Sequence, residues 1–289
     1  VKQIGGPILV FAGAGSGKTR VLTNKIAYLI EQVGLPPQNI LAVTFTNKAA
    51  QEMKSRIVDL VKVDISGISI GTFHSISAQI LRKNINKIGY TNDFVIYDQQ
   101  DSKLVIKNII KDLNLDLKQF DPKSLQIKIS NAKNNMNYAN YFKDLSENIF
   151  DEKFYSIYRD YEKTLKKNNA VDFDDLLILP LKIFNEYPEC LKFCQKKYQY
   201  VLVDEYQDTN KPQFEFIHSI SSKHKDIFVV GDDDQSIYGW RGADISNILN
   251  FKEAFGSATI IKLEQNYRST KTILDAAWSV VSKNINRAK

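Results

Sequence analysis

The fold of this chain is decided by the stretch Ile8-Leu9-Val10-Phe11-Ala12-Gly13-Ala14-Gly15-Ser16-Gly17-Lys18-Thr19. Its first four residues are apolar and predict a buried strand, and a glycine-rich turn follows them. Residues 18–33 carry apolar side chains at helical spacing, which predicts a helix that starts at the turn. This order of strand, loop and helix is typical of a phosphate-binding loop (P-loop), because glycines let backbone N–H groups surround an anion.

The loop has the groups that a nucleoside triphosphate requires. The N-terminus of the following helix adds positive potential. Lys18 can reach the β- and γ-phosphates, and the Thr19 hydroxyl can bind Mg²⁺. Ala12 stands where the general pattern has its first glycine, and we expect little effect because the rest is intact. We therefore predict ATP and Mg²⁺ as cofactors, bound by Ala12, Gly13, Ala14, Gly15, Ser16, Gly17, Lys18 and Thr19.

An acidic pair can supply the metal-binding carboxylate and the general base that a P-loop does not itself contain. The apolar segment Tyr200–Val203 predicts a strand that ends in Asp204 and Glu205. Asp204 can hold Mg²⁺ through water, and Glu205 can orient and deprotonate an attacking water. Such a pair can also be a solvated loop, so its combination with the P-loop carries the prediction.

The rest of the chain indicates an α/β fold with an insertion. Strands alternate with helices at both ends, which predicts a parallel sheet with helices on both faces. Between them the sequence is mostly helical. The predicted strands are 8–11, 40–45, 68–73, 200–203, 227–230 and 259–263. The predicted parts are 1–91 (ATPase domain, first part), 92–187 (helical insertion) and 188–289 (ATPase domain, second part).

Composition excludes several classes of protein. The 289 residues include 43% hydrophobic and 25% charged side chains, as in soluble globular domains. The sequence has no apolar run long enough to span a membrane and no secretory signal, and its two cysteines argue against a disulfide framework. We expect a cytoplasmic, nucleoid-associated protein. The net charge is +6, and the basic excess lies in residues 1–91, which suits a polyanionic partner.

Six segments carry a resemblance to a known family. They are the P-loop, Thr44–Ala50 (TFTNKAA), Gly71–Ser75 (GTFHS), Asp204–Asn210 (DEYQDTN), Gly231–Ala243 (GDDDQSIYGWRGA) and Gln265–Thr270 (QNYRST). In order and spacing they resemble the UvrD/Rep/PcrA family of superfamily 1 DNA helicases. The resemblance implies a RecA-like ATPase domain with a helical insertion. It also implies ATP-driven 3′ to 5′ translocation on single-stranded DNA and action at junctions of single- and double-stranded DNA.

The resemblance also assigns residues. It makes Gln235 a γ-phosphate sensor and Arg268 a second cation for that phosphate, beside Lys18 and Glu205 in catalysis. Arg20 and Tyr267 resemble the residues that sandwich adenine, and a guanidinium and a phenol ring both stack on a flat base.

DNA contacts follow in the same way. Aromatic faces stack on any base and so grip DNA without reading its sequence. For two of the aromatic residues, Phe73 and Trp240, a place in the hydrophobic core is the alternative. The residues implied as DNA contacts are Phe45, Phe73, His74 and Trp240, with Asn47, Lys48 and Arg241 as polar or charged neighbours.

Two departures from the family pattern predict a fragment. The family's adenine-reading glutamine would precede residue 1, and its second motor domain, with an arginine finger, would follow Lys289. We therefore expect a missing C-terminal motor domain in cis and weak hydrolysis by the chain alone. Two alternatives are an ATP- and DNA-binding module without turnover and the helicase subunit of a helicase–nuclease. Repair or replication proteins are expected partners.

Four other features have a structural and a functional interpretation. Cys190 and Cys194 could be metal ligands, but buried or free thiols are favoured. The stripe between Phe154 and Leu165 could stack bases, but core packing is favoured. Asp172 belongs to a segment that resembles another family motif, and a helix N-cap is favoured for it. The predicted helices of the insertion are 99–113, 122–135, 151–168 and 173–186, and the Asn- and Lys-rich composition of 128–143 predicts a surface loop that overlaps the second of them.

Overall fold

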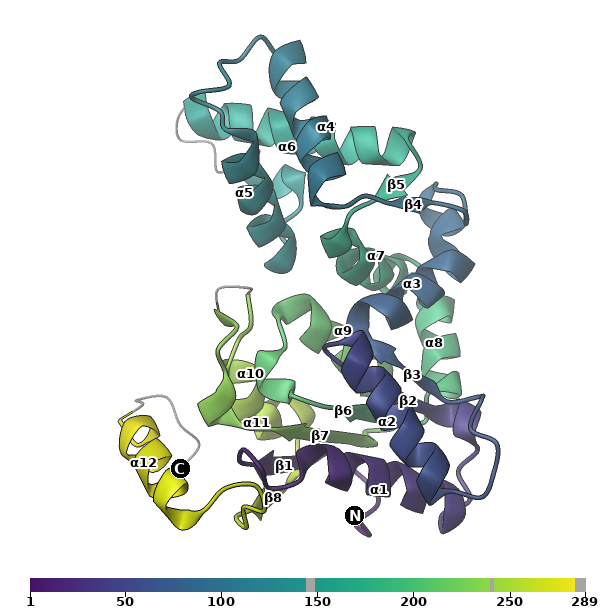
Figure 1. Cartoon of the computed structure of the whole chain (residues 1–289). Helices are drawn as coiled ribbons and strands as arrows, with labels where there is room; N and C mark the ends of the chain where they lie inside the picture. The colour runs from purple at the N-terminus through teal and green to yellow at the C-terminus, as the bar shows by residue number, and fades with distance from the viewer. Residues whose placement is uncertain (144–148, 240–241, 284–289) are drawn as a thin grey trace. The chain divides into compact units, whose positions relative to one another are not determined.

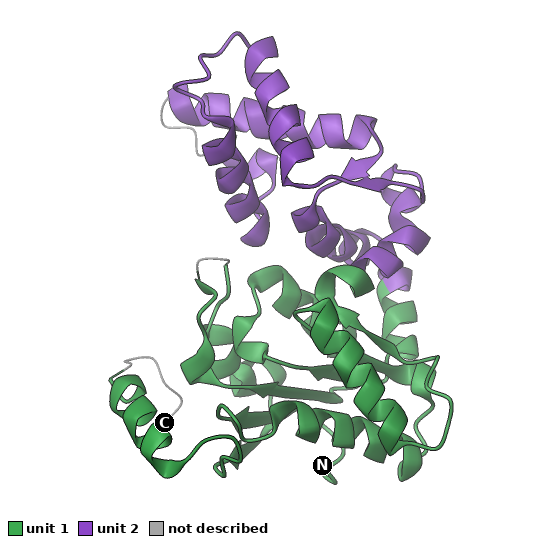
Figure 2. Cartoon of the chain, in the orientation of Figure 1, with its two compact units in different colours: residues 1–76, 191–289 green, residues 77–190 purple. Residues whose placement is uncertain are grey.

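The computed structural model describes residues 1–143, 149–239 and 242–283. The chain divides into two compact units (Figure 2), unit 1 (Val1–Ile76 with Leu191–Lys289) and unit 2 (Ser77–Cys190). The divisions fall within helices α3 (Phe73–Asn84) and α8 (Pro188–Lys197). The sequence analysis put them after residues 91 and 187, where the rhythm of strands stops and returns. The first division comes earlier because α3 from Ser77 onward makes its contacts within unit 2.

Unit 1 is built on a six-stranded sheet, and every pair of neighbouring strands in it is parallel. The order across the sheet is β3-β2-β6-β7-β1-β8. The strands are β1 (Ile8–Ala12), β2 (Ile40–Thr44), β3 (Ser69–Thr72), β6 (Tyr200–Val203), β7 (Ile227–Gly231) and β8 (Thr259–Leu263). The predicted α/β fold with a parallel sheet is confirmed, and it is that of a RecA-like domain (Figure 1).

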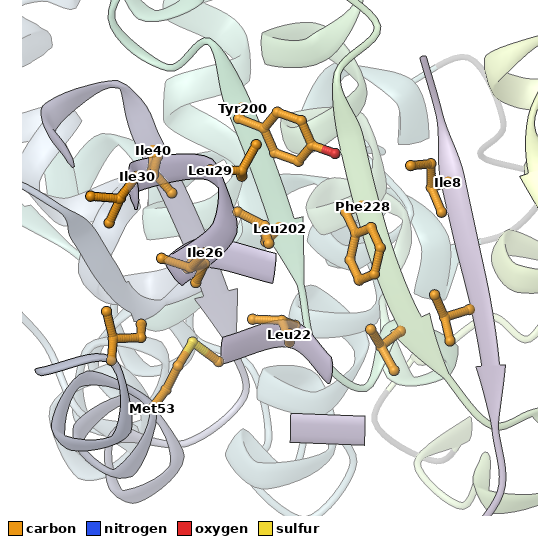
Figure 3. Close-up of a cluster of buried hydrophobic side chains, with 14 of the residues drawn as sticks. Ile8, Leu22, Ile26, Leu29, Ile30, Ile40, Met53, Tyr200, Leu202 and Phe228 are labelled. Atoms are coloured by element: carbon orange, nitrogen blue, oxygen red, sulfur yellow. The ribbon is translucent and has the colours of Figure 1, made fainter. Parts of the chain in front are cut away.

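Helices cover both faces of this sheet. On one face, Leu22, Ile26 and Leu29 of α1 (Lys18–Glu31) and Met53 of α2 (Asn47–Leu60) pack against strand residues such as Leu202 (Figure 3). On the other face, α9 (Lys211–Ser221) contacts β6. Strand residues are buried on both sides, as a covered parallel sheet requires.

The remaining elements of unit 1 are short or terminal. They are α10 (Ser246–Leu249), α11 (Phe251–Phe255), α12 (Lys271–Val281) and the 3₁₀ turns η1 (Pro37–Asn39), η4 (Tyr206–Asp208) and η5 (Asp233–Gln235). In the part of the chain that the structure describes, no helix is both long and apolar enough to cross a membrane.

Unit 2 is mainly helical. Its elements are the rest of α3, η2 (Ile85–Ile88), β4 (Val95–Ile96), α4 (Gln99–Asp112), α5 (Pro122–Asn134), η3 (Ala139–Phe142), α6 (Ile149–Lys167), β5 (Ala170–Val171), α7 (Phe173–Glu186) and the start of α8. Strands β4 and β5 form a two-stranded parallel pair. The stripe of α6 from Phe154 to Leu165 is buried in the core, as favoured from its spacing.

One sequence prediction in unit 2 is wrong. Residues 128–134, expected in a surface loop, belong to helix α5, and Lys133 within them is 1% exposed. Its Nζ donates to Asp172 Oδ2 (2.6 Å) and to Asp175 Oδ1 (2.7 Å) on α7. The helix predicted over 122–135 is confirmed, whereas the loop was predicted from composition, which does not show that a lysine of a polar segment has buried carboxylates to pair with.

Asp172 is an N-cap, as favoured from the sequence. It accepts from the Asp175 N–H (2.8 Å), and Asp175 accepts from the Asp172 N–H (3.1 Å), which makes a capping box at the start of α7. The hydroxyl of Tyr161 also donates to Asp172 Oδ2 (2.9 Å). These donors and Lys133 hold the pKa of Asp172 below its usual value despite its burial. Burial and the neighbouring Asp172 charge raise the pKa of Asp175 to about 7.

Candidate functional site

The order of the strands brings three functional segments to one edge of the sheet. Strand β7 lies between β6 and β1. The P-loop follows β1, the acidic pair follows β6, and the segment Asp232–Gln235 follows β7. Because the strands are parallel, all three segments leave the sheet at its carboxyl edge. A cavity of about 310 Å³ there is lined by Ala14, Gly15, Gly17, Lys18, Thr19, Arg20, Glu52, Arg56, Glu205, Gln235 and Arg268.

The P-loop has the compact form expected of it. Ser16 donates through its N–H (3.1 Å) and its Oγ (2.7 Å) to the Gly13 carbonyl. Ala12 is the last residue of β1 and is buried, so a side chain fits where the general pattern has glycine. Helix α1 begins at Lys18, which places its N-terminal N–H groups at the cavity.

Asn266 attaches the distant segment 265–270 to the P-loop. Its side-chain amide donates to the Ala14 carbonyl, and its Oδ1 accepts from the N–H groups of Arg268 (2.8 Å) and Ser269 (2.9 Å). The Tyr267 N–H donates to the Gly15 carbonyl (2.9 Å). Gly15 has φ +74°, and a Cβ there would lie 2.6 Å from Arg268 Cβ, so the loop requires glycine at this contact.

Lys18 and Glu205 meet across the cavity. Lys18 Nζ lies 3.0 Å from Glu205 Oε2, and the two side chains are 10% and 36% exposed. Although this ion pair is close, Lys18 Nζ is buried and makes no hydrogen bond of good geometry to any described residue. A buried ammonium with one ion-pair partner and no well-formed hydrogen bond fits a site for phosphate oxygens.

The second acidic residue is more deeply buried. Asp204 is 4% exposed, and burial, aided by the charge of Glu205, raises its pKa to about 6. Its Oδ1 accepts from the Glu205 N–H (3.0 Å). Glu205 has φ +49°, a left-handed conformation that is strained for a residue with a side chain, and strain of this kind recurs at functional sites.

The structure places the other predicted nucleotide-binding residues as follows. Thr19, Arg20, Gln235 and Arg268 line the cavity. The side chain of Tyr267 is 80% exposed next to the P-loop. The predicted residues therefore gather in one region of unit 1, although they are far apart in the sequence.

Sequence reasoning missed four residues of this region. Glu52 and Arg56 form an ion pair one turn apart on α2 and line the cavity. Their spacing predicts an ion pair but not its position beside a nucleotide site. Asn266 and the buried Gln207 were within recognised motifs, but only their contacts in the fold reveal what they hold.

The predicted DNA contacts have different environments. Asn47 and Lys48 are exposed at the N-terminus of α2, and Phe45 is half-buried. Phe73 is 1% exposed and packs edge-to-face on Phe45 at 5.7 Å, so the core alternative holds for it. The strand was expected to include Phe73, but Phe73 is the first residue of α3.

His74 is half-buried, and burial lowers its pKa, which favours the neutral imidazole. Trp240 and Arg241 lie outside the described residues.

Two cysteines and one cluster of aspartates are further residues of the types that bind metals. Cys190 and Cys194 are buried, as favoured from the sequence, and they are not joined in a disulfide. Among the described residues, the close carboxylates of Asp232, Asp233 and Asp234 are the one cluster with the spacing of metal ligands. Asp232 already accepts from the Gln235 side-chain amide and the Asp234 N–H, so its oxygens have protein partners.

Comparison with known proteins agrees with this geometry. The family profile described as the UvrD/REP helicase N-terminal domain matches residues 1–256. The chain is 50% identical over 287 residues to the ATP-dependent DNA helicase PcrA of Bacillus subtilis (strain 168), 48% to that of Staphylococcus aureus (strain NCTC 8325 / PS 47) and 47% to that of Staphylococcus epidermidis (strain ATCC 12228 / FDA PCI 1200). Each match covers 99% of this chain but 39% of the relative, so the chain spans about two fifths of their length. With a P-loop, an acidic pair and the distant Tyr-Arg segment around one cavity, the chain belongs to the UvrD/REP helicase family.

Proposed function

We propose that this chain is the ATP-binding motor domain of a DNA helicase that couples ATP hydrolysis to 3′ to 5′ translocation on single-stranded DNA. One observation carries the proposal: the P-loop lysine and the strand-end glutamate, 187 positions apart, meet at 3.0 Å in a cavity. The curated relatives are named ATP-dependent DNA helicases, which supports this activity.

ATP with Mg²⁺ suits the residues of the cavity. Lys18 would hold the β- and γ-phosphates, and its buried, acceptor-poor Nζ supports this role. Thr19 and Asp204 would bind the metal, which lowers the charge repulsion during phosphoryl transfer. Arg20 and Tyr267 would stack on the adenine, since both are exposed beside the loop.

The chain's own residues would then carry out three tasks. Glu205 would orient a water and accept its proton as the water attacks the γ-phosphorus. Arg268 would neutralise charge that builds on the γ-phosphate, and Gln235 would report its presence through a hydrogen bond. All three line the cavity, which supports their assignment.

We propose that the DNA track runs past Phe45, Asn47, Lys48 and His74, with Trp240 and Arg241 as further contacts. The exposed amide and ammonium of Asn47 and Lys48 suit phosphate oxygens, and Phe45 offers a half-buried ring. Phe73 does not contact DNA in this proposal; its buried ring packs against Phe45 and holds that side chain in place. Junctions of single- and double-stranded DNA, and repair or replication proteins, are the proposed wider partners in the nucleoid.

The relatives' greater length bears on turnover. We propose that a C-terminal motor domain completes the site in the whole protein, and that hydrolysis by this chain alone is slow. An arginine finger contributes about 10³–10⁵ in rate in related P-loop enzymes. The helicase subunit of a helicase–nuclease would share these motifs. The motifs of residues 1–289 therefore do not distinguish such a subunit from a helicase that has no nuclease.

Single-turnover hydrolysis tests the proposal. The 289-residue chain in excess over ATP, with Mg²⁺ and oligo(dT), should form ADP over minutes to hours. Lys18→Ala should abolish ATP binding measured by calorimetry, and Glu205→Gln should preserve binding but lower hydrolysis by about 10²–10⁴-fold. Hydrolysis by Glu205→Gln within threefold of the unmodified chain would show that another group is the base.

DNA binding is tested separately by fluorescence anisotropy of labelled oligo(dT) at two salt concentrations. Binding should weaken as salt rises and should change when a non-hydrolysable ATP analogue is added. Lys48→Ala should weaken it, whereas Lys103→Ala on α4 of unit 2 serves as the charge-matched control. Equal losses in both variants would contradict the proposed track.

A further inference from the structure

Gln207 is a buried side chain of the site that none of the roles above uses. It lies in the turn η4 just after the acidic pair and is 1% exposed. An amide has two donors and one acceptor oxygen, so a buried one must be matched by specific partners. Each end of this amide has such a partner.

The donor end of the amide holds the proposed base. Gln207 Nε2 donates to Glu205 Oε2 (2.9 Å) and to Asp208 Oδ2 (3.2 Å). The same Glu205 Oε2 lies 3.0 Å from Lys18 Nζ. No other described residue forms a hydrogen bond to the Glu205 side chain. The amide and the ammonium therefore hold one oxygen, and Oε1 is left to accept from a water.

The acceptor end reaches the next strand. Gln207 Oε1 accepts from the Asp232 N–H (2.9 Å), directly after β7. Asp232 in turn accepts from the side-chain amide of Gln235, the proposed γ-phosphate sensor. Hydrogen bonds thus run from Glu205 through Gln207 and Asp232 to Gln235.

The backbone is shaped around this amide. A Cβ on Gly231 would lie 2.8 Å from Gln207 Oε1 and 2.7 Å from Ile248 Cδ1. Glycine at the end of β7 is therefore needed for the amide to approach the strand. The orientation of the amide is also fixed, because a carboxylate faces one end and an N–H faces the other.

We propose that Gln207 is a positioning residue that holds Glu205 for catalysis and links it to the segment that carries Gln235. This inference rests on the proposed function. When phosphate draws the Lys18 ammonium away, Gln207 becomes the donor that keeps Oε2 in place. The presence of the γ-phosphate at Gln235 and the position of the base are then coupled through a single side chain.

Two substitutions separate the ends of the amide. Gln207→Met removes both ends while it preserves much of the buried volume. Gln207→Glu keeps an acceptor for the Asp232 N–H but replaces the donor to Glu205 with a like charge. The matched control is Gln213→Met, which removes a buried amide from the capping box of α9, away from the cavity.

The experiment measures single-turnover hydrolysis, the Kd for ATP by calorimetry and the melting temperature for each variant, with Glu205→Gln as reference. We expect both Gln207 variants to hydrolyse about 10–100-fold more slowly with a Kd within threefold of the unmodified chain. Gln213→Met should lower the melting temperature without slowing hydrolysis.

Three results would overturn the inference. If Glu205→Gln is slow but both Gln207 variants hydrolyse within threefold of the unmodified chain, positioning by Gln207 is wrong and the proposed function stands. If Gln207→Glu loses ATP binding or folding along with hydrolysis, the role of Gln207 is structural. If the unmodified chain is no faster than Glu205→Gln, the proposed function itself fails, and the inference fails with it.

Discussion

Two lysines of this chain lie among carboxylates, and they differ in how well they are satisfied. Lys133 in unit 2 is fully buried, with hydrogen bonds to Asp172 and Asp175 and its ammonium 5.3 Å from the Tyr161 ring centre. Lys18 in unit 1 has one carboxylate oxygen at 3.0 Å and no hydrogen bond among the described residues. The Lys133 ammonium is buried with protein acceptors, whereas the Lys18 ammonium lies beside a cavity and can still donate hydrogen bonds to a ligand.

We interpret this difference as one between a structural charge, Lys133, and the charge that we propose to be functional, Lys18. A buried ion pair adds to stability only when its geometry and its hydrogen bonds offset the loss of water. The Lys133 cluster meets this condition through the capping box and the Tyr161 hydroxyl. The Lys18–Glu205 pair does not meet this condition, because the Lys18 ammonium lacks hydrogen bonds that the oxygens of a bound phosphate could supply.

The largest expected effect comes from Lys18→Met. Hydrolysis should fall by about 10³-fold, because the transition state loses its cation. The free energy of unfolding in urea should change by less than about 1 kcal/mol, since Glu205 is partly solvated. A large loss of stability would mean that Lys18, like Lys133, is a structural lysine.

Lys133→Met should have the opposite profile. It leaves two buried carboxylates without their cation, which costs about 3–5 kcal/mol of stability at pH 8. ATP binding to the folded protein should be unchanged, because the cluster belongs to unit 2 and the cavity to unit 1. Urea unfolding followed by circular dichroism, with calorimetry for ATP, checks both statements.

The cost of Lys133→Met should also depend on pH. The pKa of Asp175 is raised to about 7, so this carboxyl takes up a proton as pH falls through that value. A carboxyl with a raised folded-state pKa gains relative stability at low pH and loses it as pH rises. The cost measured at pH 6 should therefore be smaller than at pH 8, and an equal or larger cost at pH 6 would contradict the assigned charges.

A smaller effect is expected at Asp204. Because its pKa is raised to about 6, it loses its charge below that pH, and Mg²⁺-dependent ATP binding should weaken by up to about tenfold per pH unit. Asp204→Asn should remove this dependence. The control is Asp208→Asn, because the pKa of Asp208 is also raised to about 6 but Asp208 lies in the turn η4 and is not proposed as a metal ligand. If Asp208→Asn removes the dependence instead, the titrating group is misassigned.

The smallest effect concerns a cap without a buried lysine. Asp98 caps α4 through the N–H groups of Gln100 (2.7 Å) and Asp101 (2.9 Å), in a capping box like that of Asp172. Asp98→Ala should cost about 1 kcal/mol in urea unfolding. Asp172→Ala should cost clearly more, because it also removes a partner of Lys133. Equal costs would mean that the buried charges of unit 2 contribute little.

The sequence by itself determined the parallel α/β fold, the P-loop, the acidic pair and the family. Those features depend on local order: an apolar strand, then glycines, then Lys18 and Thr19, or a strand that ends in Asp204 and Glu205. Periodicity also predicted the buried stripe of α6, and the position of Asp172 before a helix predicted its cap. All of these features depend either on contacts between residues near in the sequence or on which face of a helix a residue occupies, and helical spacing sets that face.

Tertiary structure alone decided which distant groups meet. It buried Phe73 beneath Phe45, included Lys133 in a charged core, and placed Glu52 and Arg56 at the cavity. It also joined Gln207 to both Glu205 and Asp232, which follow the neighbouring strands β6 and β7. Side-chain hydrogen bonds and burial depend on the order of strands across the sheet, and that order is a property of the folded chain that no local pattern encodes.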